Sequence, residues 1–171
     1  MDESVKIYTD GACKGNPGPG GYGVVLLSGE RRKELSGGFR KTTNNRMELL
    51  ACIEGLRSLK RSCTVELTSD SSYVVNSIEK GWAKRWRSKG WKLSPSKPAK
   101  NSDLWKQLLD LCAEHTVRFH WVKGHAGHPE NERCDVLAVE ASQLKELPAD
   151  LAFEAVAVPA DDLFNVGYPS E

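Results

Sequence analysis

The stretch from Tyr8 to Gly21, YTDGACKGNPGPGG, decides how the chain is organised. Its first residues end an alternating run over about residues 4 to 10, in which successive side chains are expected on opposite faces, as in a strand. A turn rich in glycine and proline follows at once, and such a turn is not expected to continue the strand. We therefore expect Asp10 to be presented at the end of the first strand. Asp-Gly is also an ordinary turn dipeptide, so Asp10 alone does not identify a site.

Length and composition describe one globular domain. A chain of 171 residues can bury one sizeable core but is short for two. No apolar run approaches the roughly 18 residues of a membrane-spanning helix. The polar, acidic start MDESVKIYTD does not resemble a signal peptide. We therefore expect a cytoplasmic protein that acts as a monomer and has no membrane partner.

The cysteines favour reduced thiols over a disulfide framework. Their number is odd, they lie far apart and none forms a CxxC pair: Cys13, Cys52, Cys63, Cys112 and Cys134. The spacings Cys112-x-x-His115 and His125-x-x-His128 are similar to those of zinc ligands. However, the first pair lies at a predicted helix end and the second follows a predicted strand, so nothing in the sequence brings them together.

The small net charge of +1 hides a strong asymmetry. All 24 lysines and arginines precede Pro148, whereas five of the 23 acids follow it, so residues 1–147 carry a net charge of +6. Residues 148–171 form an acidic tail, which we interpret as weakly ordered or as a strap on the surface. Eight cations and no acid lie between Lys80 and Ser102. This basic segment is interleaved with tryptophans, a composition that indicates nucleic-acid binding.

Periodicity along the rest of the chain predicts an α/β fold. We expect strands at about 4–10, 21–29, 31–41, 64–70 and 116–122, and helices within 42–61, 71–80, 101–115 and 129–147. The helix within 42–61 shows the clearest apolar face, with Leu49, Ile53 and Leu56 at helical spacing. Three strands followed by alternating helices and strands predict a five-stranded mixed sheet, its first three strands antiparallel, with helices on both faces.

Four acids are candidates for one site. Chemistry collects at the carboxyl ends of neighbouring parallel strands, where Asp10 and Asp70 are expected. Glu48, from the first helix, and Asp135, from the last, can approach them. Clustered carboxylates repel one another in water, whereas two divalent cations such as Mg²⁺ would be stabilised by them and could promote phosphoryl displacement.

Each acid also has a simpler interpretation. Asp10 and Asp70 can be turn formers, and Glu48 and Asp135 can be acids placed near helix N-termini, where the helix dipole favours them. His125, in the glycine-rich KGHAGH loop, can make a surface hydrogen bond or move protons near neutral pH.

Five sequence blocks together resemble ribonuclease HI, in order and spacing, over about residues 5–145. They are YTDGACKGNPGPGGYG, TTNNRMELLA, TSDSSYV, KGWK with KPAKNSDLW, and WVKGHAGHPENERCDVLA. The resemblance implies the ribonuclease H-like fold, with a catalytic domain over 1–147 and a basic protrusion over about 80–101. The family's metal-binding acids fall on Asp10, Glu48, Asp70 and Asp135, and its loop histidine falls on His125.

The resemblance also implies an activity. It is hydrolysis of the RNA strand of RNA·DNA hybrids with two Mg²⁺ ions, for which Mn²⁺ is a possible substitute, leaving 5′-phosphate and 3′-hydroxyl ends. The alternatives are a catalytically silent hybrid-binding domain and an integrase-like DNA nuclease of the same fold. The presence of all four acids disfavours the first, and the asparagine-rich segments and the basic protrusion disfavour the second.

Further residues are implied as the substrate-binding surface. The RNA strand would contact Cys13, Gly15, Asn16 and Asn44, with Asn45 also available to the minor groove, while Asn16 and Thr43 would seat a DNA phosphate. The basic protrusion would grip the DNA strand through Trp82, Lys84, Arg85, Arg87, Lys89 and Trp91. Capping of the first helix is an alternative role for Thr43. Ser72 departs from the longer amide expected beside Asp70, so one minor-groove contact would be shorter or mediated by water.

Overall fold

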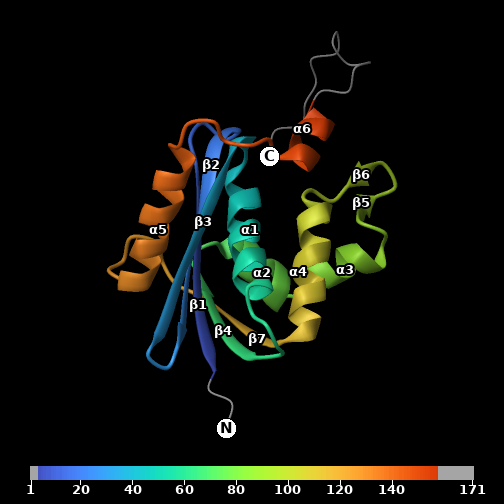
Figure 1. Cartoon of the computed structure of the whole chain (residues 1–171). Coiled ribbons are helices and arrows are strands. Elements are labelled where there is room, and N and C mark those ends of the chain that lie inside the picture. Colours follow the sequence, from blue (N-terminus) through green and yellow to red (C-terminus); the bar gives the residue numbers. More distant parts are fainter. Residues whose placement is uncertain (1–3, 158–171) are drawn as a thin grey trace.

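A five-stranded mixed sheet forms the centre of the computed structural model, which describes residues 4–157 (Figure 1). Its strand order is β3-β2-β1-β4-β7. The strands are β1 (Val5–Cys13), β2 (Gly18–Ser28), β3 (Arg31–Thr42), β4 (Thr64–Ser69) and β7 (Thr116–Trp121). β1 to β3 pair antiparallel, whereas β4 pairs parallel to both β1 and β7. The predicted α/β class and strand arrangement are confirmed.

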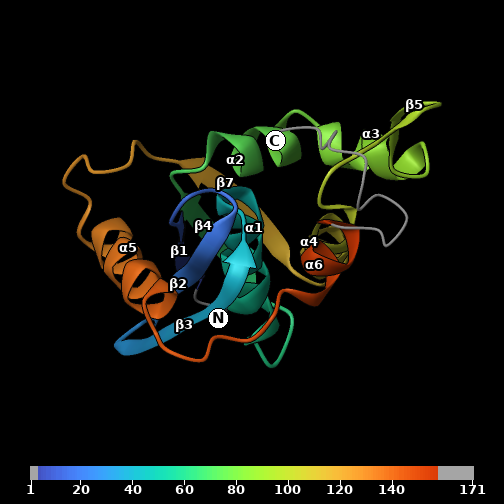
Figure 2. The ribbon, with the colours of Figure 1, turned by 90° about the horizontal axis from the view of Figure 1, so that it is seen from above.

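Helices cover both faces of this sheet, as predicted. One face packs against α5 (Pro129–Ser142), and the other against α1 (Asn44–Arg57), beside which lies α4 (Ser102–Glu114) (Figures 1 and 2). The chain between β4 and α4 forms α2 (Ser72–Glu79), α3 (Trp82–Ser88) and a ribbon of β5 (Lys92–Ser94) and β6 (Lys97–Pro98). The basic protrusion is therefore α3 with this small ribbon, whose two strands were not predicted.

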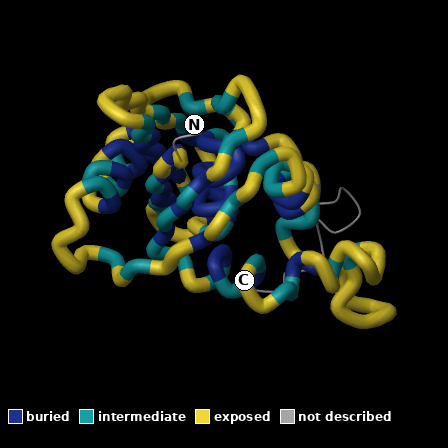
Figure 3. Tube along the Cα trace, turned by 90° about the horizontal axis from the view of Figure 1, so that it is seen from below, coloured by how far each residue is buried: buried dark blue, intermediate teal, exposed yellow. Residues whose placement is uncertain are grey.

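The main core lies between the sheet, α1 and α4. The predicted apolar face of α1 is fully buried there, since Leu49, Ile53 and Leu56 expose no surface. Trp105 of α4 is also fully buried. In Figure 3 the buried residues gather on the central elements, while the protrusion and loops are mostly exposed. Among residues 4–157 there is no helix with both the length and the apolar character that crossing a membrane requires.

The C-terminal segment lies on the body. The chain from Pro148 was predicted to be a weakly ordered tail or a surface strap, and residues 148–157 fit the strap, with a short and largely exposed helix, α6 (Leu151–Ala157). Asp150 is only 7% exposed, and the backbone N–H of Arg40 donates to the carbonyl of Pro148 at 2.9 Å. The rest of the predicted tail, 158–171, lies outside the described residues.

Helix α5 approaches β2 closely because glycines face it. A Cβ atom on Gly23 would lie 2.2 Å from the carbonyl oxygen of Cys134, and one on Gly21 would lie 2.2 Å from that of Ala138. Any side chain at these positions would push α5 away from the sheet. Since α5 carries Asp135, the two glycines also determine where that acid stands.

We predict that Gly23→Ala lowers the free energy of unfolding by about 1–3 kcal/mol, because α5 must shift to accept the methyl group. Urea unfolding measures this change. Val136→Ala, on the exposed side of the same helix, is the control and should stay within about 0.5 kcal/mol of the parent. Equal stability of the glycine variant and the parent would contradict the close-packing argument.

Candidate active site

The site lies where the pairing between β1 and β4 ends. The prediction that the first strand ends at Asp10 is wrong, because β1 continues to Cys13, paired with β2. Its parallel pairing with β4 ends earlier, at Thr9 and Ser69. Asp10 is thus the first residue of β1 beyond that pairing, and Asp70 is the first residue after β4. The two acids lie side by side where the β1–β4 pairing ends, although only Asp70 follows the end of a strand.

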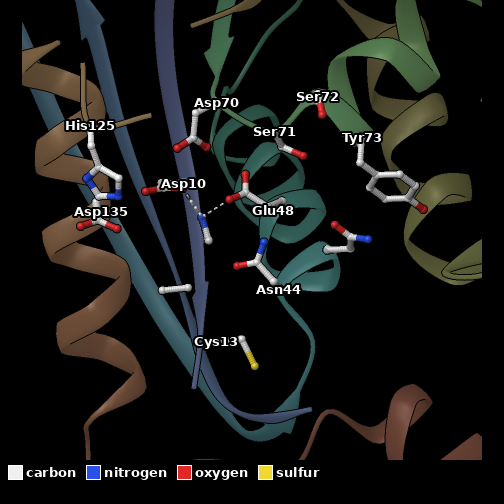
Figure 4. Close-up of a pocket in the computed structure, with 13 residues that line it drawn as sticks. Asp10, Cys13, Asn44, Glu48, Asp70, Ser71, Ser72, Tyr73, His125 and Asp135 are labelled. Carbon is white, nitrogen blue, oxygen red and sulfur yellow. Dashed lines mark hydrogen bonds between the residues drawn. The ribbon is translucent and has the colours of Figure 1, made fainter. Parts of the chain in front are cut away.

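These acids line an open cavity of about 500 Å³ (Figure 4). Its walls come from β1, the N-terminal part of α1, the start of α2, the loop before α5 and α5 itself. The lining residues are Asp10, Gly11, Ala12, Cys13, Asn44, Asn45, Glu48, Asp70, Ser71, Ser72, Tyr73, His125 and Asp135. All four acids predicted for the site, and His125, therefore face one cavity.

Three of the acids form a tight group. Asp10, Glu48 and Asp70 each offer an oxygen within 4.8 Å of the others. The backbone N–H of Gly11 fixes two of them, since it donates at 2.9 Å to Asp10 Oδ1 and at 2.9 Å to Glu48 Oε1. Asp10 is 4% exposed and Glu48 is 3% exposed. Water therefore contributes little to the solvation of these two carboxylates.

Two glycines allow the three acids to come this close to one another. A Cβ atom on Gly11 would lie 2.5 Å from the backbone nitrogen of Glu48, so a side chain there would displace α1. A Cβ atom on Gly124 would lie 2.6 Å from Asp70 Oδ2. The glycine of the Asp-Gly pair is therefore required for packing against α1 and does not form a turn.

The carboxylates hold protons more strongly than free ones. Burial is the largest cause, and together with the charges of Asp70 and Asp135 it outweighs a hydrogen bond with Glu48 to raise the pKa of Asp10 to about 8. Burial and the neighbouring Asp10 raise the pKa of Glu48 well above its usual range. The pKa of Asp70 is also raised, again chiefly by burial. The group therefore favours a positive partner, either protons or a cation.

A divalent cation fits this group. Glu48 Oε2 is buried and has no hydrogen-bond partner among the described residues. A buried carboxylate oxygen without a donor is costly, and a metal ion would satisfy it. Carboxylate oxygens in an open, polar cavity suit a hard cation that keeps part of its water shell. Asp10, Glu48 and Asp70 are thus the residues that could hold a metal.

Asp135 and His125 stand on the other wall of the cavity (Figure 4). Asp135 lines the same cavity as the other three acids, as expected, but lies outside the tight group of three, and its charge reaches Asp10 and Asp70. His125 has a positive φ of 55° in the loop before α5, and its charge opposes the rise in the pKa of Asp70. Both residues are placed to act on a molecule held at the acids.

The zinc spacing does not form a site. Within residues 4–157, the three acids are the one group of three or more potential metal ligands. His115 instead accepts a hydrogen bond from the backbone of Cys63 through Nδ1, at 3.1 Å. The spacing therefore reflects a helix end and a loop that are independent of each other.

The residues predicted to contact the RNA strand, the minor groove or a DNA phosphate near the cavity divide into two sets. Cys13, Asn44 and Asn45 line the cavity, whereas Gly15, Asn16 and Thr43 do not. Asn16 Oδ1 accepts from the backbone N–H of Asn44 at 2.9 Å, so it holds the start of α1 against the turn after β1. Thr43 is buried, and its hydroxyl oxygen caps α1 by accepting from Arg46. The capping role considered for Thr43 is thus present.

None of the predicted protrusion residues lines the cavity. Lys84 and Lys89 are exposed, whereas Arg87 pairs with Asp110 at 2.6 Å. The ammonium of Lys80 lies over the ring of Trp82, 5.2 Å from its centroid. Trp91 is partly buried against the core, and so is Trp86, which packs against Trp105. The tryptophans thus hold the protrusion together and attach it to α4.

Sequence reasoning missed Ser71 and Tyr73 on the cavity wall. Ser71 caps α2 by accepting from Val74, and the hydroxyl of Tyr73 accepts from the indole of Trp105 at 2.8 Å. The signal available was their position directly after Asp70. A polar and an aromatic residue that follow an acid at a strand end are expected to face the same opening.

The comparisons identify the family of this chain. The sequence profile described as RNase H matches residues 2–143. The ribonuclease H of Desulforamulus reducens is 64% identical over 149 residues, which cover 87% of this chain and 94% of that protein. The chain belongs to the RNase H family. The predicted resemblance to a ribonuclease H, and with it the prediction of an enzyme, is confirmed.

Solved structures of the family have the same fold. LC9-RNase H1, a type 1 RNase H, aligns with a TM-score of 0.75 at 30% identity over 92% of this chain and 83% of its own. LC11-RNase H1, solved in complex with an RNA/DNA hybrid, aligns with a TM-score of 0.63 at 26% identity over 81% and 96%. The ribonuclease H-like fold predicted from the sequence is confirmed.

The pKa of Asp10 leads to a prediction for the metal-free protein. A carboxyl whose pKa rises on folding binds more protons in the folded than in the unfolded state between the two pKa values, so stability falls as pH rises through that window. For Asp10 this window runs from its usual 3.8 to about 8. We expect Asp10→Asn to stabilise the metal-free protein by about 1–3 kcal/mol at the upper end of the window, because it removes one buried charge.

Thermal unfolding at several pH values in EDTA measures this effect. The parent should lose stability toward the upper end of the window and regain it when Mg²⁺ is added, whereas Asp10→Asn should show a smaller response to both. Glu30→Gln, which removes an exposed carboxylate in the turn between β2 and β3, is the control and should respond as the parent does. A parent whose stability does not change over this pH range would contradict the predicted titration.

Proposed function

We propose that the chain is an endonuclease that hydrolyses the RNA strand of RNA·DNA hybrids with two Mg²⁺ ions, leaving 5′-phosphate and 3′-hydroxyl ends. The observation that supports this most is the buried group of Asp10, Glu48 and Asp70, with an unpartnered oxygen on Glu48, in a member of the RNase H family. A relative of known structure, LC11-RNase H1, was solved with an RNA/DNA hybrid.

The four acids would hold the metal ions. Asp10 belongs to the group of three and shares the N–H of Gly11 with Glu48, and its charge also interacts with that of Asp135, so it would be the acid shared by both ions. The chemistry that divalent cations supply in such a site is activation of the attacking water and stabilisation of the leaving oxygen of the phosphodiester. Mn²⁺ has similar ligand preferences and is a possible substitute for Mg²⁺.

His125 would move a proton. Its imidazole stands on the cavity wall opposite Glu48, in a loop outside any helix or strand (Figure 4). An imidazole changes protonation near neutral pH, so it can take a proton from water or give one to the leaving oxygen. Its loop position allows it to approach the reacting phosphate and to withdraw.

Substrate recognition would use the cavity rim and the basic protrusion. Asn44 and Asn45 offer amide donors and acceptors beside Glu48, which suits 2′-hydroxyl groups in the minor groove. Cys13, Gly15 and Asn16 would contact the RNA strand, and Asn16 with Thr43 a DNA phosphate. Trp82, Lys84, Arg85, Arg87, Lys89 and Trp91 would contact the DNA strand beyond the cavity. We further propose that the chain acts as a monomer in the cytoplasm.

The deciding experiment offers labelled RNA·DNA, RNA·RNA and DNA·DNA duplexes with Mg²⁺ or with EDTA. We expect cleavage of the RNA strand in the hybrid alone, only with metal, and none by Asp10→Asn. Glu30→Gln removes an exposed carboxylate in the turn between β2 and β3 and should cleave normally. Binding of the hybrid without cleavage would indicate a silent binding domain, and cleavage of DNA·DNA would indicate an integrase-like nuclease. Either result overturns the proposal.

The role of the basic protrusion makes a separate prediction. Replacing Lys84, Arg85, Arg87 and Lys89 with alanine should weaken hybrid binding and reduce the dependence of log K on log salt by up to roughly 0.9 per lost phosphate contact. Binding is measured in the Asp10→Asn background, which prevents cleavage. The matched control removes four exposed cations at the opposite end of the sheet: Arg31, Lys33, Lys60 and Arg61. An equal effect of both sets would show that only net charge matters.

A further inference from the structure

Arg46 is a buried cation that the proposed chemistry does not use. It lies in the first turn of α1, two residues before Glu48, and is 4% exposed. Burying a guanidinium is costly unless nearly all its donors find acceptors, and even then the net gain in stability is small. A buried ion pair has, however, a strict geometry. Its partners indicate which parts of the molecule it aligns.

Two carboxylates bind this guanidinium in pairs of hydrogen bonds. Asp103 accepts from Nη1 at 2.9 Å and from Nη2 at 2.8 Å. Asp150 accepts from Nε at 2.7 Å and from Nη2 at 3.0 Å. Two-point contacts of this kind fix both the distance and the angle between the planar groups. Arg46 therefore holds three segments of the chain in one fixed arrangement.

The first partner leads to the basic protrusion. Asp103 is in the first turn of α4, directly after the protrusion ends. Asn101, at that junction, has a φ of 61° and accepts from Arg46 Nη1 at 3.4 Å. Trp105, which is four residues after Asn101, packs against Trp86 of α3 with ring centroids 5.9 Å apart. The position of Asp103 is thus linked to the position of α3.

The second partner belongs to the C-terminal segment. Asp150 is buried, and besides Arg46 its Oδ2 accepts from the hydroxyl of Thr42 at 2.7 Å. Thr42 ends β3 and immediately precedes the cap of α1. In Figure 2 the segment crosses from the end of α5 to α6, which contacts β3. Asp150 is therefore attached both to the start of α1 and, through Arg46, to the start of α4.

We propose that Asp150 is a positioning residue for substrate binding. Through Arg46 it fixes the angle between the start of α1, which presents Asn44, Asn45 and Glu48 to the cavity, and the root of the basic protrusion. A hybrid that spans both surfaces binds well only when this angle is correct. This inference rests on the proposed function, because it assumes that cavity and protrusion hold the same duplex.

The charge of the cluster supports a positioning role. Two carboxylates share one cation, so the cluster carries a net negative charge, and although the side chain of Asp103 is 38% exposed, Arg46 and Asp150 are buried, which is a poor arrangement for stability alone. Removing the charge of Asp150 while keeping its shape leaves Arg46 paired with Asp103 alone. The guanidinium is then no longer fixed from its second side, so it can rotate, and the start of α4 can turn with it relative to α1 while the Arg46–Asp103 pair stays intact. Asp150→Asn is therefore expected to loosen the angle while the fold remains.

The test compares two hybrid lengths. The short hybrid is chosen as one whose KM is unchanged by the fourfold alanine variant of the protrusion, and the long hybrid as one whose KM is raised by it. For Asp150→Asn we expect the KM of the long hybrid to rise about fivefold or more, with kcat within about twofold of the parent, and the KM of the short hybrid to stay unchanged. Assays are run well below the melting temperature of every variant.

Two further variants keep the test decisive. Thr42→Val removes only the hydroxyl that binds Asp150 and should shift the KM of the long hybrid in the same direction by a smaller factor. Glu154, in the same C-terminal segment as Asp150, forms an exposed ion pair with Arg40 of β3. Glu154→Gln breaks this pair and should leave both KM values unchanged. A lowered melting temperature with both KM values unchanged, or an equal rise for both hybrids, would overturn the positioning role. If the parent protein cleaves no hybrid, the proposed function itself fails, which is a separate result.

Discussion

Burial, together with repulsion from neighbouring acids, of three carboxylates held at the end of one parallel strand pair is the constraint on which this structure depends. Asp10 and Asp70 are brought together because the β1–β4 pairing stops at Thr9 and Ser69. Glu48 reaches them because Gly11 lets α1 approach β1. In the absence of a cation the group is unfavourable, which the raised pKa of each member expresses. The surrounding fold supplies the stability that keeps these acids close.

Rigid packing on both sides of the sheet provides that stability. On one face, the cap at Thr43 and the buried side chains of α1 fix the helix that carries Glu48. On the other face, Gly21 and Gly23 let α5 approach β2 and so place Asp135 opposite the tight group. The Arg46 cluster joins the start of α1 to the start of α4, next to the basic protrusion. In the proposed function, the chemistry and the recognition of a long duplex would therefore share one rigid base, the N-terminal turn of α1.

Local patterns predicted most of this fold, and long-range contacts account for what they missed. Alternation in residues 64–69 and the spacing of Leu49, Ile53 and Leu56 are local signals, and the strand and helix formed as predicted. The glycine-rich run after Asp10 was interpreted as a turn, but pairing with β2 keeps it extended to Cys13. Burial of Asp150 was missed because its partners Thr42 and Arg46 lie more than 100 positions away. The distance of Asp135 from the other acids likewise depends on how α5 packs.

The most direct test of this account is the number of protons released when Mg²⁺ binds. Calorimetric titrations at pH 7 in buffers of different ionisation enthalpy measure that number. Since the pKa of Asp10 is about 8 and that of Glu48 is raised as well, the account predicts release of at least one proton per protein, and a smaller release from Asp10→Asn. Mg²⁺ binding without any proton release would show that the acids are already ionised, and would contradict the claim that the fold holds them together against their mutual repulsion.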